Sequence, residues 1–291
     1  MKFALQFANS IRPDPDGAKR LALAAEAAGF ESLIAIEHVV WPTDYASTYP
    51  YAASGKLPGG HQSKMPDPLI WIAFVSGVTT RLRFMTGVLI LPQRNPLVLA
   101  KEVATLDHLT GGRLSLGIGV GWLREEFDAL GIPFDKRGAR SDDYIAAMRA
   151  LWSGDDVSYK GPFVEFSAVS CNPKPVNGSV PILIGGHSTM AARRAGRLGD
   201  GFFPATGAQV DIAPLLDIAR QSAEEAGRDP SAIEITTGCP AALPGASADP
   251  LGAVQECAAR GVDRIALRLT DFLPDLEEKI AEFGEQVIDR L

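Results

Sequence analysis

Short apolar runs recur eight times along the chain, and most are followed by a loop rich in Pro, Asp or Gly and then by an amphipathic segment. Continuous apolar runs of this length are typical of strands buried on both faces, as in parallel sheets. The predicted strands are 3–8, 33–36, 82–91, 114–120, 180–184, 201–204, 233–237 and 264–269. The chain therefore repeats a β–loop–α unit.

Repeated β–α units can close into a (β/α)8 barrel or form an open doubly wound sheet. The doubly wound fold usually carries a glycine-rich fingerprint after its first strand, whereas residues 10–15 contain no glycine. The units are also spread evenly over 291 residues, a length that suits a barrel with insertions. We predict an α/β protein with one (β/α)8 TIM-barrel domain over residues 1–291.

Two segments are longer than a barrel connection requires. Residues 153–176 precede the fifth strand, and Gly161-Pro162 within them predicts a hairpin. Residues 40–66 follow the second strand at its carboxyl end, where barrel enzymes place their active sites. This loop holds three of the five tyrosines of the chain. Because long ordered loops are usually functional, we expect 40–66 to cover the site.

Composition excludes several function classes. A net charge of −7 argues against nucleic-acid or anionic-membrane partners. No apolar run approaches the roughly 20 residues of a membrane span, and the first residues are too short a run for a signal peptide. Cys171, Cys239 and Cys257 are far apart and form no CxxC pair, so we expect no metal site. Serine-hydrolase, P-loop and zincin motifs are also absent. We expect a cytoplasmic protein that acts on a small molecule.

Glycines gather at the ends of several predicted strands. Residues 185–187 precede Ser188, a candidate cap of the next helix, and a helix N-terminus offers free amides to a phosphate. A tight turn that needs glycine only for its dihedral angles is the alternative. Gly117, Gly119 and Gly121 alternate along the fourth strand, which weakens a strand unless something packs flat against it or the barrel bends there. A planar ring system is the first candidate, although a bend at a barrel corner would need the same residues.

One of the four histidines ends the second strand. Strand alternation puts His38 on the same face as Ile36 and Glu37 on the other. At the mouth of a barrel such a histidine can exchange protons near neutral pH, although a purely structural hydrogen bond is the alternative. His61 lies in the long loop, and His187 lies in the glycine turn. His38 is the leading catalytic candidate.

Together these motifs resemble the luciferase-like monooxygenase superfamily, in its branch dependent on the deazaflavin coenzyme F420. The segments that carry the resemblance are Glu37-His38, 86–101 (TGVLILPQRNPLVLAK), 106–113 (LDHLTGGR), 116–122 (LGIGVGW), Gly185-Gly186 and 194–201 (RAGRLGDG). They run in order over most of the chain, and after about residue 210 only the general α/β rhythm continues. The resemblance implies a barrel that binds F420 or a flavin at its carboxyl end.

The resemblance also implies residue roles. His38 would be the acid/base or a contact of the ring, and Gly87-Val88 would form a bulge behind the cofactor ring, often with a non-proline cis peptide. The residues expected at the cofactor are Glu37, Gly87, Val88, Gly119, Val120, Gly121, Gly185, Gly186 and His187. Those expected at the substrate are Trp41, Tyr45, Tyr49, Tyr51, His61 and Trp122. Trp122 stands where some sugar-phosphate dehydrogenases of this group carry a glutamate proton donor, so their proton relay does not transfer directly.

The leading functional hypothesis is hydride transfer between F420 and a small organic substrate, with the cofactor supplying the reactivity. An FMN-dependent monooxygenase is the first alternative, and a cofactor-binding protein without turnover is the second. The acidic tail of F420 would need basic groups, for which Arg94, Lys101, Arg193 and Arg197 are candidates. A homodimer is the family-level expectation.

Overall fold

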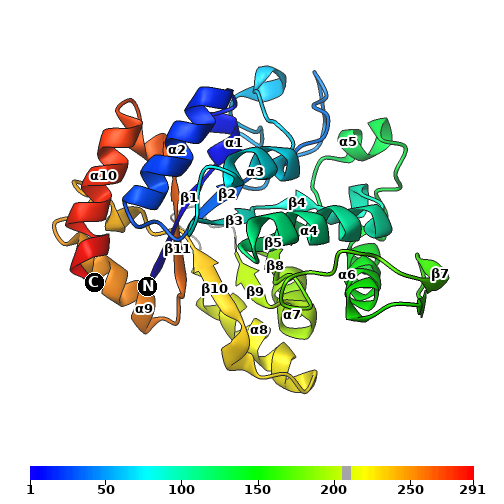
Figure 1. Cartoon of the computed structure of the whole chain (residues 1–291). Coiled ribbons are helices and arrows are strands. Elements are labelled where there is room, and N and C mark those ends of the chain that lie inside the picture. Colours follow the sequence, from blue (N-terminus) through cyan, green and yellow to red (C-terminus); the bar gives the residue numbers. More distant parts are fainter. Residues whose placement is uncertain (205–210) are drawn as a thin grey trace.

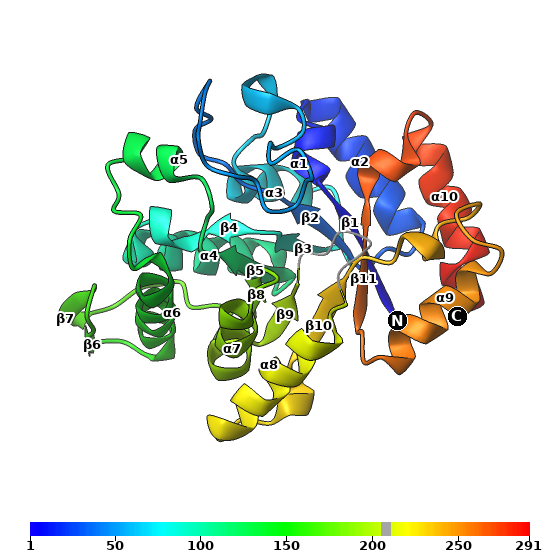
Figure 2. The same ribbon diagram turned by 180° about the vertical axis from the view of Figure 1, so that it is seen from behind.

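The computed structural model describes residues 1–204 and 211–291, in which parallel strands close into a barrel surrounded by helices (Figures 1 and 2). The strands are β1 (Lys2–Gln6), β2 (Ser32–Ala35), β3 (Arg83–Thr86), β4 (Leu89–Ile90), β5 (Leu114–Gly119), β8 (Ile182–Gly185), β9 (Gly201–Phe203), β10 (Glu234–Thr237) and β11 (Arg264–Arg268). Their order is β3-β2-β1-β11-β10-β9-β8-β5-β4, and an additional β3–β5 pairing closes the ring. The predicted TIM barrel is confirmed, except that the predicted strand 82–91 is divided into β3 and β4.

Helices follow the strands, and most of them cover the outside of the barrel (Figures 1 and 2). They are α1 (Ala8–Ile11), α2 (Pro15–Ala27), α3 (Pro68–Ser76), α4 (Pro96–Thr110), α5 (Arg124–Ala129), α6 (Arg137–Ser153), α7 (Thr189–Leu198), α8 (Ala213–Glu225), α9 (Pro250–Ala259) and α10 (Leu276–Gln286). The 3-10 turns are η1 (Gly60–Gln62), η2 (Leu91–Gln93), η3 (Pro230–Ala232), η4 (Pro240–Ala242), η5 (Leu269–Phe272) and η6 (Ile288–Arg290). Asp67, Asn95 and Asp249 each cap a helix that begins with proline, as the Asp-Pro and Asn-Pro pairs dictate.

The insertion before the fifth barrel strand contains the predicted hairpin, β6 (Val157–Lys160) paired with β7 (Glu165–Val169). Asp143 of α6 anchors it, because its carboxylate accepts hydrogen bonds from the Tyr159 hydroxyl at 2.6 Å and from the Phe163 amide at 2.8 Å. The hairpin projects from the side of the molecule beyond α6 (Figure 1). This insertion therefore extends the outer surface.

The barrel interior is a packed core and not a pore. Six strands each contribute one buried side chain to it: Ala4, Ile34, Met85, Leu183, Phe203 and Ala266. A larger apolar cluster fills the space between the strands and the surrounding helices. Ile34 points inward, and residues 36–38 continue from the carboxyl end of this strand, which stops at Ala35. His38 thus lies above the packed interior, on the carboxyl side of β2.

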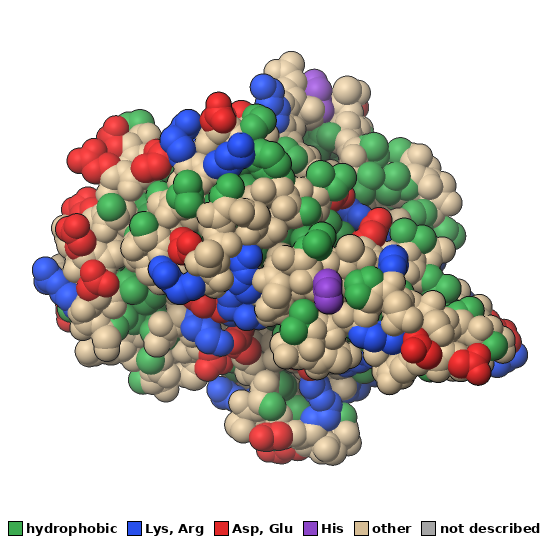
Figure 3. All heavy atoms as spheres, viewed as in Figure 1, with side chains coloured by type: hydrophobic (Ala, Val, Ile, Leu, Met, Phe, Trp, Pro, Cys, Tyr) green, Lys and Arg blue, Asp and Glu red, His purple; other side chains and the backbone are tan. Residues whose placement is uncertain are grey.

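Helix α3 is apolar on both faces, with Trp71 and Ile72 buried and Ile70 and Phe74 largely exposed. Figure 3 views the surface over α2, α3 and α4, where apolar side chains lie among scattered charges. In the described ranges, no helix has both the length and the apolar character needed to cross a bilayer. That residues 1–291 form one domain stays a prediction.

Candidate active site

The break between β3 and β4 carries the non-proline cis peptide that the resemblance implied, between Gly87 and Val88. The side chain of Val88 lies against two other strands. A Cβ on Gly119 of β5 would be 2.6 Å from Val88 Cγ2, and a Cβ on Gly185 of β8 would collide with Val88 Cγ1. A Cβ on Gly87 itself would collide with Ile34. We call Gly87, Val88, Gly119 and Gly185 the backing, in which two glycines make room for Val88 and Gly87 makes room for Ile34.

The glycines of β5 are explained by atoms of the chain itself. A Cβ on Gly117 would collide with the Thr86 carbonyl oxygen, just as one on Gly119 would meet Val88. Gly121 has a φ of 79°, a backbone conformation that favours glycine. The flat packing partner predicted for these glycines is therefore the neighbouring strand, and a planar ligand is not needed to explain them. Contacts of Gly119, Gly121 and the half-buried Val120 with a cofactor stay predictions.

The turn after β8 has the features of a phosphate site. Gly186 has a φ of 121°, and the ten-residue α7 begins directly after Ser188, whose hydroxyl accepts a hydrogen bond from the Ala191 amide. His187 Nδ1 is buried and has no hydrogen-bond partner in the described part of the chain. A buried polar atom without a partner is costly, so a ligand oxygen would stabilise it. The residues present thus fit the phosphate of a flavin-type cofactor.

His38 is paired with a carboxylate that the sequence did not reveal. His38 Nδ1 lies 2.9 Å from Glu126 Oε2, and both side chains are almost fully buried. Glu126 Oε1 accepts the amide hydrogens of Val39 at 2.7 Å and Val40 at 3.4 Å. Because a carboxylate only accepts, Nδ1 carries the hydrogen and Nε2 is left for other partners. The one sequence signal for this pairing was that Glu126 lies in the first turn of the helix that follows β5.

A connected set of rings, which we call the rim, joins His38 to the phosphate turn. The rim consists of His38, Trp41, Tyr45, Tyr49, Tyr51, Trp122 and His187. Trp122 contacts His38, and its ring centroid lies 5.2 Å from that of Tyr49. Tyr49 contacts Tyr51, whose ring centroid lies 5.0 Å from that of His187. All predicted substrate residues except His61 are therefore brought together.

Burial raises the pKa of Tyr49 to about 12 and raises that of Tyr51 above its ordinary value. Both hydroxyls therefore stay protonated at neutral pH. The side of the rim that these two rings form is uncharged.

The first turn of α5 fixes the loop that carries the rim. Glu125 Oε1 accepts the amide hydrogens of Ala46 at 2.7 Å and Ser47 at 3.1 Å. Burial acts to raise the pKa of Glu125, but hydrogen bonds from the Ser47 hydroxyl and from backbone amides lower it to about 2. Two consecutive carboxylates, Glu125 and Glu126, thus hold both the rim loop and His38.

Two predicted site residues lie elsewhere. His61 is exposed in η1 and makes no ring contact with the rim in the part of the chain described. Glu37 is buried behind the β3–β4 break, where it accepts the Ile90 amide hydrogen at 2.6 Å and pairs with Arg94. Burial raises the pKa of Glu37, and the Arg94 guanidinium opposes that rise. Their roles as substrate and cofactor contacts stay predictions.

Most of the predicted basic groups are engaged within the chain. Arg94 pairs with Glu37 and Asp67. Burial acts to lower the pKa of Arg94, but these two carboxylates raise it above its ordinary value. Lys101 donates to a backbone carbonyl, and Arg197 pairs with an aspartate on α6. The exposed Arg193 has no side-chain partner among the described residues, and neither it nor Lys101 forms an ion pair there.

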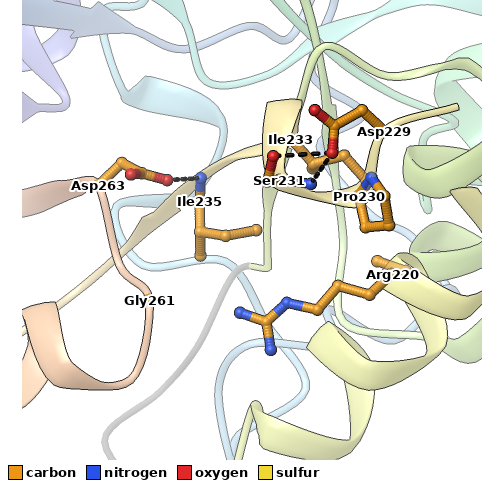
Figure 4. A pocket seen from close by; sticks show the side chains of 9 residues that line it. Arg220, Asp229, Pro230, Ser231, Ile233, Ile235, Gly261 and Asp263 are labelled. Carbon is orange, nitrogen blue, oxygen red and sulfur yellow. Dashed lines mark hydrogen bonds between the residues drawn. The ribbon is translucent and has the colours of Figure 1, made fainter.

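A hollow of about 420 Å³ lies at the opposite end of the barrel (Figure 4). Its residues Ile233 and Asp263 precede β10 and β11, so it opens at the amino ends of the strands. Asp263 accepts the Ile235 amide hydrogen at 2.8 Å, and Asp229 accepts hydrogen bonds from Ser231. These polar groups stabilise turns, and the hollow is separate from the site around His38.

Comparison with known proteins places this geometry in a family. The model for luciferase-like monooxygenases matches residues 2–251. An uncharacterised protein of Mycobacterium tuberculosis is 36% identical over 208 residues, 72% of each chain. An FMNH2-dependent dimethylsulfone monooxygenase of Pseudomonas fluorescens is 33% identical over 191 residues, 64% of this chain and 46% of its own. The coenzyme F420-dependent tetrahydromethanopterin reductase of Methanopyrus kandleri shares the fold, with a TM-score of 0.79 at 16% identity over 99% of each chain. The chain belongs to the luciferase-like monooxygenase family.

Proposed function

We propose that the chain transfers a hydride between coenzyme F420 and a small organic substrate, with His38 exchanging the coupled proton. The observation that carries this proposal is the 2.9 Å contact between His38 Nδ1 and Glu126 Oε2. Hydride transfer to a carbonyl, or from an alcohol, requires a proton to be delivered or removed at the same centre. A histidine whose tautomer is fixed by a buried carboxylate performs that task at neutral pH.

When bound, the deazaflavin supplies the hydride chemistry. The chain residues that would hold it fall into two groups. The backing, with Val120 and Gly121, would contact the ring, and Gly186, His187 and the first amides of α7 would bind the phosphate. Glu37 would contribute to the cofactor site indirectly, by holding Arg94 and the Ile90 amide in place.

The remaining residues position His38 and shield it. Glu126 orients the imidazole by accepting the hydrogen of its Nδ1. The rings of Trp41 and Trp122 lie edge-on to His38, with centroids 4.3 and 5.8 Å away. Water is thereby displaced from two sides of the imidazole, which strengthens its interaction with Glu126. The aromatic character of the rim favours a substrate that is uncharged where it meets these rings.

An FMN-dependent monooxygenase is the second candidate. Two observations favour it: the 33% identity to the dimethylsulfone monooxygenase, and the pairing of Arg94, Lys101 and Arg197 within the chain. FMN lacks the acidic tail for which those basic groups would be needed. A protein that binds cofactor without turnover is the third candidate.

The test is a pair of assays on the full chain. In one, F420 and its reduced form are mixed with panels of alcohols, aldehydes and ketones, and the absorbance of the deazaflavin is followed. In the other, reduced FMN and oxygen are supplied with organic sulfur compounds and ketones, and oxygenated product is measured. We expect substrate-dependent turnover only with F420. Oxygenated product with FMN alone contradicts the proposal, and cofactor binding without turnover in either assay supports the third candidate.

Two structural expectations accompany this proposal. Residues 1–291 act as one domain, so thermal unfolding is expected to be a single cooperative transition. The assembly is a cytoplasmic homodimer, whose mass in solution light scattering measures. A monomer with full activity would contradict the expected dimer.

A further inference from the structure

One buried side chain joins the two ends of the long loop between β2 and α3. Asn9 of α1 is fully buried. Its NH2 group donates to the Ile36 carbonyl at 2.8 Å, where the loop begins, and to the Pro66 carbonyl at 2.7 Å, where it ends. Its oxygen accepts the Ile36 amide hydrogen at 2.9 Å. A single carboxamide thus holds three backbone groups from both ends of this loop.

Arg94 makes the same connection one residue further along on each side. Its guanidinium donates to Glu37 at 3.0 Å and also to Asp67. The planar fork of an arginine can bridge two carboxylates in this way. We call four residues the neck, because Asn9 and Arg94 hold them side by side: Ile36, Glu37, Pro66 and Asp67.

His38 directly follows the neck, and the segment around it is tied to other elements. Glu126 pairs with His38 and accepts two amide hydrogens from residues 39–40. The tip of the loop differs. In the described ranges, the hydrogen bonds of residues 48–65 join only residues of the loop itself. The loop therefore consists of a fixed segment, 36–40, and a self-contained tip, 48–65.

We propose that Asn9 and Arg94 are positioning residues, which keep His38 in place while the tip opens and closes over the site. Opening breaks the ring contacts that Tyr49 and Tyr51 make with the barrel side of the rim. Because the neck fixes the backbone next to His38, a ligand then enters or leaves without displacing the imidazole. The effect on turnover rests on the proposed function, whereas the arrangement of the neck does not.

The test makes the same substitution at two asparagines. In Asn9→Asp the side chain keeps its acceptor oxygens but has no hydrogen for the two carbonyls of the neck. Asn95→Asp is the matched control, because Asn95 only accepts hydrogen bonds, from the first amides of α4. Hydrogen–deuterium exchange of the cofactor-free full chain is followed by mass spectrometry. We expect residues 36–40 of the parent to exchange about tenfold or more slowly than the tip. Asn9→Asp should lose this protection, and Asn95→Asp should keep it.

The imidazole of His38 is observed by NMR of the full chain labelled with ¹⁵N-histidine, and its signals are assigned from their loss in His38→Ala. The parent and Asn95→Asp should show one tautomer with the hydrogen on Nδ1, whereas Asn9→Asp should show a mixture. Asn9→Asp should also lower kcat with F420 by about tenfold or more, with KM within about twofold. If the parent itself does not turn over, the proposed function is contradicted, and exchange and NMR still decide the role of the neck.

Arg94→Lys provides a second variant in case Asn9→Asp does not fold. Lysine keeps the positive charge but not the fork that reaches both Glu37 and Asp67. It should speed the exchange of residues 36–40 in the same direction. The proposal is overturned if folded variants keep the exchange of 36–40 and the single tautomer of His38. It is also overturned if 36–40 exchanges as fast as the tip in the parent.

Discussion

The backing and the rim are built in opposite ways. In the backing, the side chain of Val88 occupies the space that a Cβ on Gly119 or Gly185 would need, Ile34 occupies that of Gly87, and no charge is involved. In the rim, aromatic rings are placed by a long loop whose amides are held by Glu125 and Glu126. Steric exclusion fixes the first and carboxylate hydrogen bonds fix the second. One added methyl group should therefore damage the backing, whereas loss of a single negative charge should damage the rim.

The largest effect is expected at His38. Removing a proton-transfer group typically costs about 10²–10⁴-fold in rate, so His38→Ala should lower kcat by that amount while cofactor affinity in the backing stays within about twofold. His108→Ala is the matched control, because His108 is an exposed histidine on α4 with no predicted role in the site. Steady-state kinetics and cofactor titration measure both quantities. Unchanged kcat in His38→Ala would remove His38 from the chemistry.

Glu126→Gln tests whether the carboxylate sets the tautomer of His38. Glutamine has only one acceptor oxygen. If that oxygen keeps its hydrogen bond from the Val39 backbone, the glutamine NH2 group faces His38 and donates to Nδ1. The hydrogen of the imidazole then moves to Nε2. A reversed tautomer should lower kcat by about 10²-fold or more. Glu125→Gln, next along the chain, should stay within a few-fold of the parent. Equal losses in both variants would mean that α5 only holds the loop.

Gly119→Ala tests the steric account of the backing. The new Cβ would lie 2.6 Å from Val88 Cγ2, and overpacking of this kind costs about 1–3 kcal/mol in the free energy of unfolding. Cofactor affinity should fall as well. Gly77→Ala is the control, since no atom lies within 4 Å of a Cβ there. Val88→Ala in the Gly119→Ala background should restore part of the stability in chemical denaturation, and strict additivity of the two substitutions would refute the contact.

The smallest effect is expected from Glu125 in acid. Its pKa is lowered from 4.5 to about 2, so its contribution to holding the loop is complete above pH 4.5 and is lost as the pH falls toward 2. Because this residue is partly exposed, the contribution should stay below about 1 kcal/mol. We expect the tryptophan fluorescence of the parent to change over this window, and Glu125→Gln to show less of that change. Identical acid titrations of the parent and of Glu125→Gln would show that Glu125 does not hold the loop.

The sequence predicted those features that depend on local pattern. Buried apolar runs gave the strands, and Asp-Pro and Asn-Pro pairs gave the helix starts. The aromatic loop was correctly associated with the barrel mouth, because a loop after a barrel strand can only emerge there. His38 was singled out for the same reason.

What the sequence did not predict depends on distant contacts. His38 and Glu126 are 88 residues apart, and the loop after β2 and the first turn of α5 bring them together. Trp122 carries no carboxylate, yet a carboxylate four residues later pairs with the histidine. The reason for the glycines of β5 required the position of Val88. Sequence pattern identified these positions, and only packing identified what they contact.

The most direct test of the central claim is a side-by-side titration of the cofactor-free full chain with coenzyme F420 and with FMN, followed by fluorescence quenching. The account predicts micromolar or tighter binding of F420, with FMN weaker by about tenfold or more, which corresponds to about 1.4 kcal/mol. Tighter binding of FMN would contradict the deazaflavin assignment and support a flavin monooxygenase. Binding of neither would leave the barrel and its family intact and would contradict the proposed function.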